Sequence, residues 1–166
     1  ALLAITYQVA TAPEAEVDTT GLQTAGFGAA DVKEESAGLA GVQDVRQHFV
    51  NNWLMGSLRI VEGTVVNKGK YPLTRIQVRG RLYDSGGNVL GEWQSFCGNL
   101  LTDAELTTLT EAEIQRRLTQ PLGSSAANDR VSPNSQIPFM VVIAHHDQQN
   151  VGKTTVVISG AEKLLE

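Results

Sequence analysis

The chain has 166 residues, of which 42% are hydrophobic and 19% are charged, a composition typical of one globular domain with a sizeable core. Its formal net charge of −5 argues against general affinity for nucleic acids, which requires a basic surface. The single cysteine, Cys97, excludes an intramolecular disulfide, and no set of Cys and His residues has zinc-ribbon spacing.

The N-terminal segment predicts one strand and then a connection. Leu3, Ile5, Tyr7 and Val9 alternate with smaller or polar residues, which is the period of a half-buried strand and not of a membrane helix. From about residue 11 to 41 the chain is rich in Ala, Gly, Glu and Thr, and it predicts a loosely ordered linker with room for a short helix over residues 29–40. Because the sequence begins with Ala and not Met, we expect residues upstream that processing or the choice of expressed segment removed.

The body begins near Val45 and predicts strands joined by turns. Alternation and β-branched residues place strands over residues 45–50, 57–67, 73–83, 88–96, 136–146 and 153–159. In the strand over residues 73–83, one face is predicted to point to the core: Thr74, Ile76, Val78, Gly80 and Leu82; Leu73 falls on the opposite face. Asp84 can bond the backbone of its own turn, and Gly86 and Gly87 tolerate positive φ, so a hairpin closes there.

Residues 97–123 interrupt this pattern with a helical insert. Thr102 with Glu105 and Thr110 with Glu113 each match a capping box, which predicts two short helices, or one kinked helix, over residues 103–119. An apolar stripe runs through Leu106, Leu109, Ile114 and Leu118. We expect the insert to pack onto the sheets; a role in a partner surface is the alternative.

Strands joined by short turns form antiparallel sheets, and two such sheets stacked face to face form a β-sandwich. The sequence therefore predicts an all-β, mainly β fold of about seven strands with one helical insertion at about residues 102–120. Residues 1–44 are predicted to be an N-terminal strand and linker, and residues 45–166 the sandwich domain.

Residues 49–158 carry a distinctive order of motifs: FVNNWLMGSLRIVEGTVVNKGKYPLTRIQVRGRLYDSGGNVLGEW, then CGN, the insert and SPNSQIPFMVVI. This order resembles a bacterial domain of unknown function that usually sits behind an N-terminal zinc-ribbon finger and one transmembrane helix. Its central part also resembles FxLYD-type modules, whose pattern falls on Gly63, Val65, Asn67, Leu82, Tyr83, Asp84, Gly87 and Val89.

The resemblance implies an immunoglobulin-like β-sandwich in the periplasm or another extracytoplasmic space. It implies a membrane anchor in the full-length protein, through a helix that this chain lacks together with the finger. The family brings no established catalytic residues, so the resemblance assigns none here.

Two sets of residues could carry chemistry. His145, His146 and Asp147 are the most metal-like cluster, and His48 could join them, but adjacent strand residues point to opposite faces and favour a solvated corner. Cys97 with a His and an Asp is the raw material of a thiol nucleophile. Its place at a strand end beside the insert favours a small buried hydrophobe.

Two other sets could form an interaction surface. Arg75, Arg79 and Arg81 line one strand face as a basic stripe for an acidic partner, anionic lipid or a polyanionic glycan. The alternative is a solvated face offset by carboxylates such as Glu62 and Glu92. Trp53 and Met55 lie at a predicted turn, where they either fold back onto the core or contact a partner or a membrane.

These patterns favour a non-catalytic protein-binding or assembly module that needs no cofactor and is not an enzyme. Its expected partner is another protein at the cell envelope, and exchange of the first strand could also form a homodimer. Two alternatives stay open. One is a metal-dependent or thiol hydrolase that uses His145, His146 and Asp147 or Cys97, and the other is a structural spacer.

Overall fold

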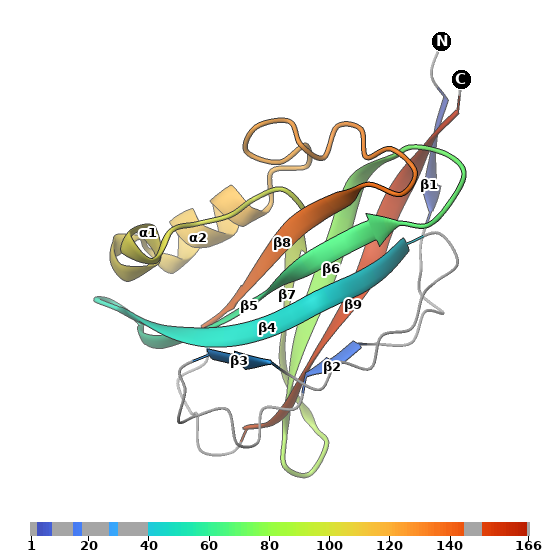
Figure 1. The fold of residues 1–166 in the computed structure, drawn as a ribbon. Helices are drawn as coiled ribbons and strands as arrows, with labels where there is room; N and C mark the ends of the chain where they lie inside the picture. Colours follow the sequence, from blue (N-terminus) through green and yellow to red (C-terminus); the bar gives the residue numbers. More distant parts are fainter. Residues whose placement is uncertain (1–2, 8–14, 18–26, 30–39, 145–150, 166) are drawn as a thin grey trace.

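The computed structural model describes residues 3–7, 15–17, 27–29, 40–144 and 151–165 (Figure 1). Three short strands come first: β1 (Leu3–Tyr7), β2 (Ala15–Val17) and β3 (Phe27–Ala29). Six longer strands follow: β4 (Ala40–Asn52), β5 (Gly56–Asn67), β6 (Leu73–Asp84), β7 (Val89–Phe96), β8 (Gln136–Ile143) and β9 (Val151–Leu165). Between β7 and β8 lie the two helices α1 (Asp103–Thr108) and α2 (Glu111–Leu118).

The described strands form two antiparallel sheets, which confirms the predicted mainly β fold. One sheet has the order β1-β9-β6-β7, with β2 also paired to β9, and the other has the order β3-β4-β5-β8. The sequence predicted about seven strands, whereas the body is made of six long ones, β4 to β9, and β1 to β3 add short pairings to β9 and β4. β1 confirms the predicted first strand.

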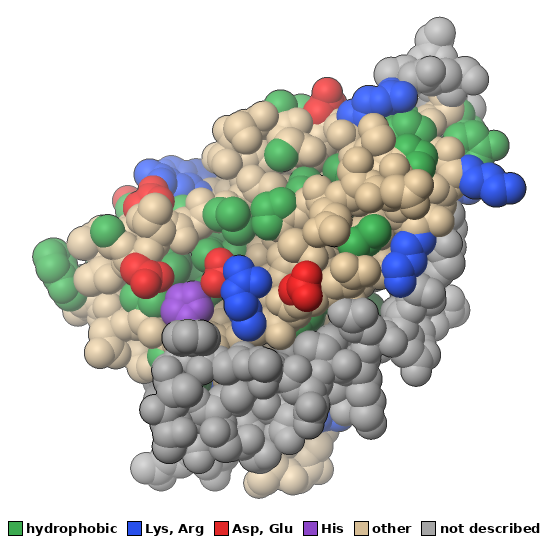
Figure 2. Space-filling view, viewed as in Figure 1, with side chains coloured by type: hydrophobic (Ala, Val, Ile, Leu, Met, Phe, Trp, Pro, Cys, Tyr) green, Lys and Arg blue, Asp and Glu red, His purple; other side chains and the backbone are tan. Residues whose placement is uncertain are grey.

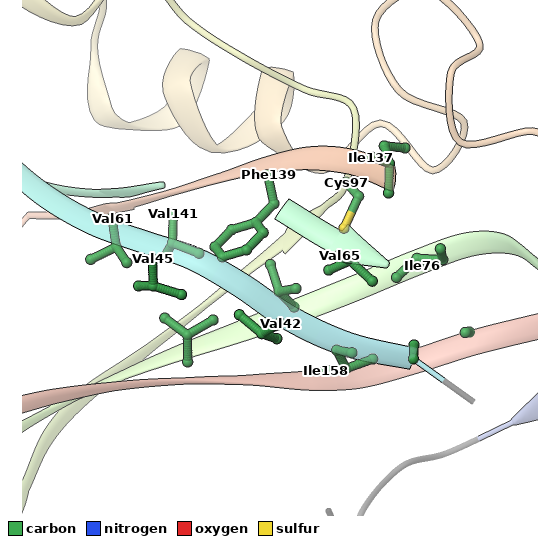
Figure 3. Packing of buried hydrophobic residues seen from close by; sticks show 14 of the residues in the cluster. Val42, Val45, Val61, Val65, Ile76, Cys97, Ile137, Phe139, Val141 and Ile158 are labelled. Carbon is green, nitrogen blue, oxygen red and sulfur yellow. The ribbon is translucent and has the colours of Figure 1, made fainter. Parts of the chain in front are cut away.

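Side chains from both sheets share one hydrophobic core (Figure 3). Phe139 of β8 lies fully buried in it with Val61 and Val65 of β5 and Ile76 of β6. The core also explains Gly63, because a Cβ there would lie 2.8 Å from the Phe139 ring. Burial of the 18 residues of this core drives the two sheets together, and each fully buried Val, Leu, Ile or Phe side chain contributes about 1.5–3 kcal/mol.

A second core joins the helical insert to the outer face of the β4-β5-β8 sheet. Leu106, Ile114 and Leu118 pack there with residues of the three strands: Val50, Leu58, Ile60, Met140 and Val142. Both capping boxes form as predicted, with each threonine hydroxyl accepting from the backbone N–H of the glutamate three residues later. The prediction that the insert packs onto the sheets is confirmed.

The structure corrects several details. β4 begins at Ala40, five residues before the predicted start of the body. Leu73, predicted to point away from the core, is 1% exposed, because Arg75 adopts φ 50° at a register shift and the strict alternation starts only after it. In the β6–β7 hairpin only Gly87 takes a positive φ. The short helix predicted for residues 29–40 falls largely outside the described residues, as does Val9.

Within the described residues, neither helix has the length and apolar character needed to cross a membrane.

Candidate interaction surface

The most metal-like cluster of the sequence, His145, His146 and Asp147, lies outside the described residues. Among the residues that are described, no group of three or more His, Cys, Asp or Glu side chains could hold a metal ion. His48 instead lies between two carboxylates on the outer face of β4: its Nδ1 is 3.6 Å from Glu62 Oε2, and its Nε2 is 3.4 Å from Asp103 Oδ1. Through Asp103 this histidine links β4 to the start of α1.

Cys97 is completely buried in the core shared by the two sheets. Its backbone N–H donates to the Ile76 carbonyl at 2.9 Å, which holds the end of β7 against β6. Burial raises the pKa of the Cys97 thiol, because a thiolate would lose its hydration there. The prediction of a small buried hydrophobe is confirmed, and the thiol is in the wrong environment for a nucleophile.

Arg75, Arg79 and Arg81 are ion-paired and partly covered. Arg75 Nη1 lies 2.7 Å from Glu162 Oε2, and the Nε atoms of Arg79 and Arg81 lie 3.4 and 3.5 Å from the two oxygens of Glu92. Their side chains are 47%, 24% and 29% exposed. Glu92 therefore offsets this stripe as predicted, but Glu62 does not: it belongs to the other sheet and lies beside His48 and Arg46.

Trp53 and Met55, the two large apolar residues predicted to lie in the β4–β5 turn, have opposite environments. Trp53 is 80% exposed and its neighbour Leu54 69%, whereas Met55 folds back against the second core. Figure 2 shows hydrophobic side chains protruding at the end of the molecule where Figure 1 places α1 and this turn. We call Trp53 and Leu54 the apolar tip. Leu54 was not among the residues predicted for an interaction surface, although it stands in the same predicted turn between Trp53 and Met55.

Asn52 holds the apolar tip in one conformation. Its Oδ1 accepts from the backbone N–H groups of Leu54 at 2.8 Å and Met55 at 3.0 Å. Its Nδ2 donates to the carbonyls of Leu106 and Leu109 at 2.7 and 2.8 Å, at the end of α1. The backbone N–H of Trp53 donates to the Thr107 carbonyl at 2.9 Å. The tip is thus fastened to α1 and does not depend on its own side chains for its shape.

A small cavity of about 210 Å³ lies at the other end of the insert, lined by Asn99, Leu100, Leu101, Arg117, Gln120 and Ser124. Asn99 serves the fold there, because its Nδ2 donates to the carbonyls of Phe96, Leu118 and Gln120. Arg117 is ion-paired with Glu105. The lining brings together no acid, base and nucleophile of the kind that catalysis needs.

Residues 42–152 match the family described as "Protein of unknown function (DUF3426)". The chain belongs to this family. The match confirms the predicted domain of unknown function, and it runs from β4 through the insert to the first residues of β9. Comparison with curated proteins and with solved structures gave no significant match. The zinc-ribbon finger, the transmembrane helix and the relation to FxLYD-type modules stay predictions.

The residues of this DUF3426 domain that carried the sequence resemblance have structural roles. Asn67 Nδ2 donates to the carbonyls of Tyr71 and Val131, and its Oδ1 accepts from the Gly69 N–H, which shapes the β5–β6 turn. Asp84 Oδ1 accepts from the N–H groups of Gly86 and Asn88 in the β6–β7 hairpin. The apolar tip, by contrast, makes no contribution to either core through Trp53 or Leu54. The packing of the described residues therefore does not require these two side chains.

Proposed function

We propose that this DUF3426 domain is a non-catalytic protein-binding module. In this proposal its two sheets form an immunoglobulin-like β-sandwich, held outside the cytoplasmic membrane in the periplasm or another extracytoplasmic space. The observation that carries the binding role is the apolar tip, where two large hydrophobic side chains stand 80% and 69% exposed on a turn that is fixed from behind. Contiguous exposed apolar groups on a rigid scaffold are typical of contact surfaces.

The energetics of recognition favour this use of the tip. Interface hot spots are enriched in tryptophan, and truncating a central one costs roughly 2–4 kcal/mol of binding free energy. A turn that already has its bound shape loses little conformational entropy on binding. The hydrogen bonds of the Asn52 side chain, and the bond from the backbone N–H of Trp53 to the Thr107 carbonyl, provide that pre-organisation. Trp53 and Leu54 are therefore suited to act as anchors.

The position of the tip in the fold supports presentation away from an anchor. β1 pairs with residues 161–165 of β9, so the first and last described strands lie together. Figure 1 shows this pair at the opposite end of the molecule from the β4–β5 turn. If an upstream membrane helix precedes β1, as the sequence resemblance implies, the tip would point away from the bilayer and towards proteins of the envelope.

The candidates for catalysis give weaker support to an enzyme. Cys97 is buried in the core with a raised thiol pKa, and a nucleophile needs both exposure and thiolate character. His48 is engaged with Glu62 and Asp103 on a sheet face. A binding role requires an exposed contact surface, which Trp53 and Leu54 provide. A hydrolase would require an acid, a base and a nucleophile close together, and the described residues do not bring such a set together.

The test is a crosslinking pull-down from envelope extracts of the source cells. Three baits are compared: the native chain, a tip variant with Trp53→Ser and Leu54→Ser, and a stripe variant with Arg75→Gln, Arg79→Gln and Arg81→Gln. Equal unfolding midpoints establish that the variants are folded. A partner captured by the native chain and lost with the tip variant supports the proposal. Loss with the stripe variant alone would move the contact to the β6 face, and capture by no bait would favour a structural spacer.

A further inference from the structure

The end of the molecule that carries the apolar tip is acidic. Two segments build it, residues 50–58 of the β4–β5 hairpin and residues 101–115 of the insert; neither contains a Lys or Arg, and Arg59, the next residue of β5, is only 4% exposed. The insert segment holds four carboxylates: Asp103, Glu105, Glu111 and Glu113. The Asp103 side chain is 76% exposed, and Glu111 is exposed at the start of α2. The cations of the insert, Arg116 and Arg117, follow in the last turn of α2, where Arg117 pairs with Glu105.

We propose that the tip inserts Trp53 and Leu54 into an apolar pocket of a partner protein whose rim carries Lys or Arg side chains. This inference rests on the proposed function and adds the chemistry of the partner. The apolar pair gains by leaving water, and the surrounding carboxylates gain by meeting cations at the polar edge of the contact. Charge at the rim also steers the two proteins together and excludes partners of the same sign.

The same charges argue against a membrane surface as the occupant. Loops and helices that bind anionic bilayers place Lys and Arg beside their apolar residues, and each such cation contributes about 1 kcal/mol near the surface. Here the flanking segments supply carboxylates instead, which an anionic headgroup layer repels. An exposed tryptophan and leucine flanked by carboxylates are complementary to an apolar protein pocket with Lys or Arg at its rim.

The contact geometry follows from how the turn is built. Met55 packs into the second core, and hydrogen bonds from Asn52 and from the Trp53 backbone N–H fasten the turn to the end of α1. Glu111 follows Leu109 by two residues, so its exposed carboxylate is the one expected beside a partner that takes Trp53, whereas Asp103 lies at the far end of α1 beside His48. Substitution of Trp53 and substitution of Glu111 are therefore both expected to weaken binding to the same partner.

The experiment places a benzophenone amino acid at position 54 of the full-length protein in its own cells. A second version carries the same group at Val89, a control of similar character that is 53% exposed at the start of β7. After irradiation, mass spectrometry of the crosslinked peptides identifies what lies at each position. We expect position 54, and not position 89, to give one adduct with a single site of another protein that has Lys or Arg residues around an apolar depression.

The identified partner is then purified and titrated with the native chain and three variants. Trp53→Ser is expected to weaken binding by at least about tenfold. Glu111→Gln is expected to weaken it severalfold at low salt and hardly at all at high salt, because rim charges are screened. Val89→Ser serves as the matched control and is expected to leave the affinity unchanged.

Other outcomes overturn the inference. A lipid adduct at position 54, together with binding to vesicles of phosphatidylcholine and phosphatidylglycerol that Trp53→Ser abolishes, would make the tip a membrane contact. An adduct with a second copy of the chain, or equal yields at positions 54 and 89, would also exclude the proposed partner. If the pull-down captures a partner that position 54 never reaches, the proposed function stands and this inference fails; if neither experiment finds a partner, both fail.

Discussion

Individual buried asparagines organise the irregular parts of this domain. Asn52, Asn67, Asn99 and Asn128 are each at most 4% exposed, and the side chain of each bonds two or more backbone groups in turns or at strand and helix ends. Asn128 is the fullest case, because its Nδ2 donates to the Ile76 carbonyl and its Oδ1 accepts from the Ile76 N–H, both at 2.9 Å. One side chain thus takes the place of a strand partner beside the register shift of β6.

Replacing Asn128 by alanine is expected to destabilise the domain by about 1–3 kcal/mol, because it leaves the Ile76 N–H buried and unpaired, whereas the Ile76 carbonyl keeps the bond from the Cys97 N–H. Urea unfolding measures the change in free energy. Asn51→Ala, at an exposed position of β4, is the control and is expected to change the free energy of unfolding by less than about 0.5 kcal/mol. A loss at Asn128 no larger than that at Asn51 would contradict the assigned role.

The Asp84 carboxylate gives the β6–β7 hairpin a pH dependence. Hydrogen bonds from Asn88, first from its backbone N–H and then from its side chain, lower the pKa of Asp84 below its ordinary value of 3.8, and the Gly86 N–H adds to this. A depressed folded-state pKa means that the ionised form is favoured on folding. The stabilisation is therefore present above the ordinary pKa and is lost as the pH falls through the folded-state pKa.

The variant Asp84→Asn removes this titration and keeps the side-chain shape. We expect the native chain to be more stable than the variant near neutral pH, and the difference to shrink at acid pH below the ordinary value of 3.8. Thermal unfolding of both proteins across this pH range measures the difference. A gap that stays constant down to the lowest pH would show that ionisation of Asp84 is irrelevant to stability.

At the scale of elements, the helical insert depends on packing more than on its own helices. α1 and α2 have 6 and 8 residues, well below the length of about 12–15 at which isolated helices become marginal in water. Each capping box contributes about 1 kcal/mol, whereas each fully buried Leu or Ile contributes about 1.5–3 kcal/mol. Three such side chains, Leu106, Ile114 and Leu118, therefore outweigh the two caps.

This comparison predicts the order of two substitutions in α2. Leu118→Ala is expected to cost about 2–4 kcal/mol, because it leaves a cavity under a fully buried residue. Thr110→Ala is expected to cost only about 1 kcal/mol, because it removes one cap and no buried surface. Chemical denaturation compares the two variants with the native chain. If the cap variant proved the less stable, local helix formation and not packing would hold the insert in place.

At the scale of the whole molecule, β9 extends beyond the family match and yet lies inside the fold. The match ends at residue 152, two residues into β9, while β9 pairs with β6 on one side and with β1 and β2 on the other. Its side chains also enter the shared core through Val156, Ile158 and Ala161. The folding unit is therefore larger than the matched region.

Two truncations test this boundary. A chain of residues 1–152 is expected to lose cooperative unfolding, because β6 would be left without its β9 partner and the core without three of its buried residues. A chain of residues 40–166 is expected to keep a cooperative transition at reduced stability, because β1 to β3 pair only at the outer sides of β9 and β4. Circular dichroism during heating distinguishes the two results, and a cooperative 1–152 chain would place β9 outside the folding unit.

The amino-acid sequence by itself determined the features that depend on neighbours in the chain. Alternation located the strands, Asp84 with its glycines located the hairpin, and the two threonine–glutamate pairs located both helices, because periodicity and capping are local properties. Only the tertiary structure separated Glu62 from Glu92, buried Leu73 at the register shift of β6, and sent Met55 inward while Trp53 and Leu54 stayed exposed. Those outcomes depend on which strands pair and on what the insert covers, and contacts between residues far apart in the sequence decide both.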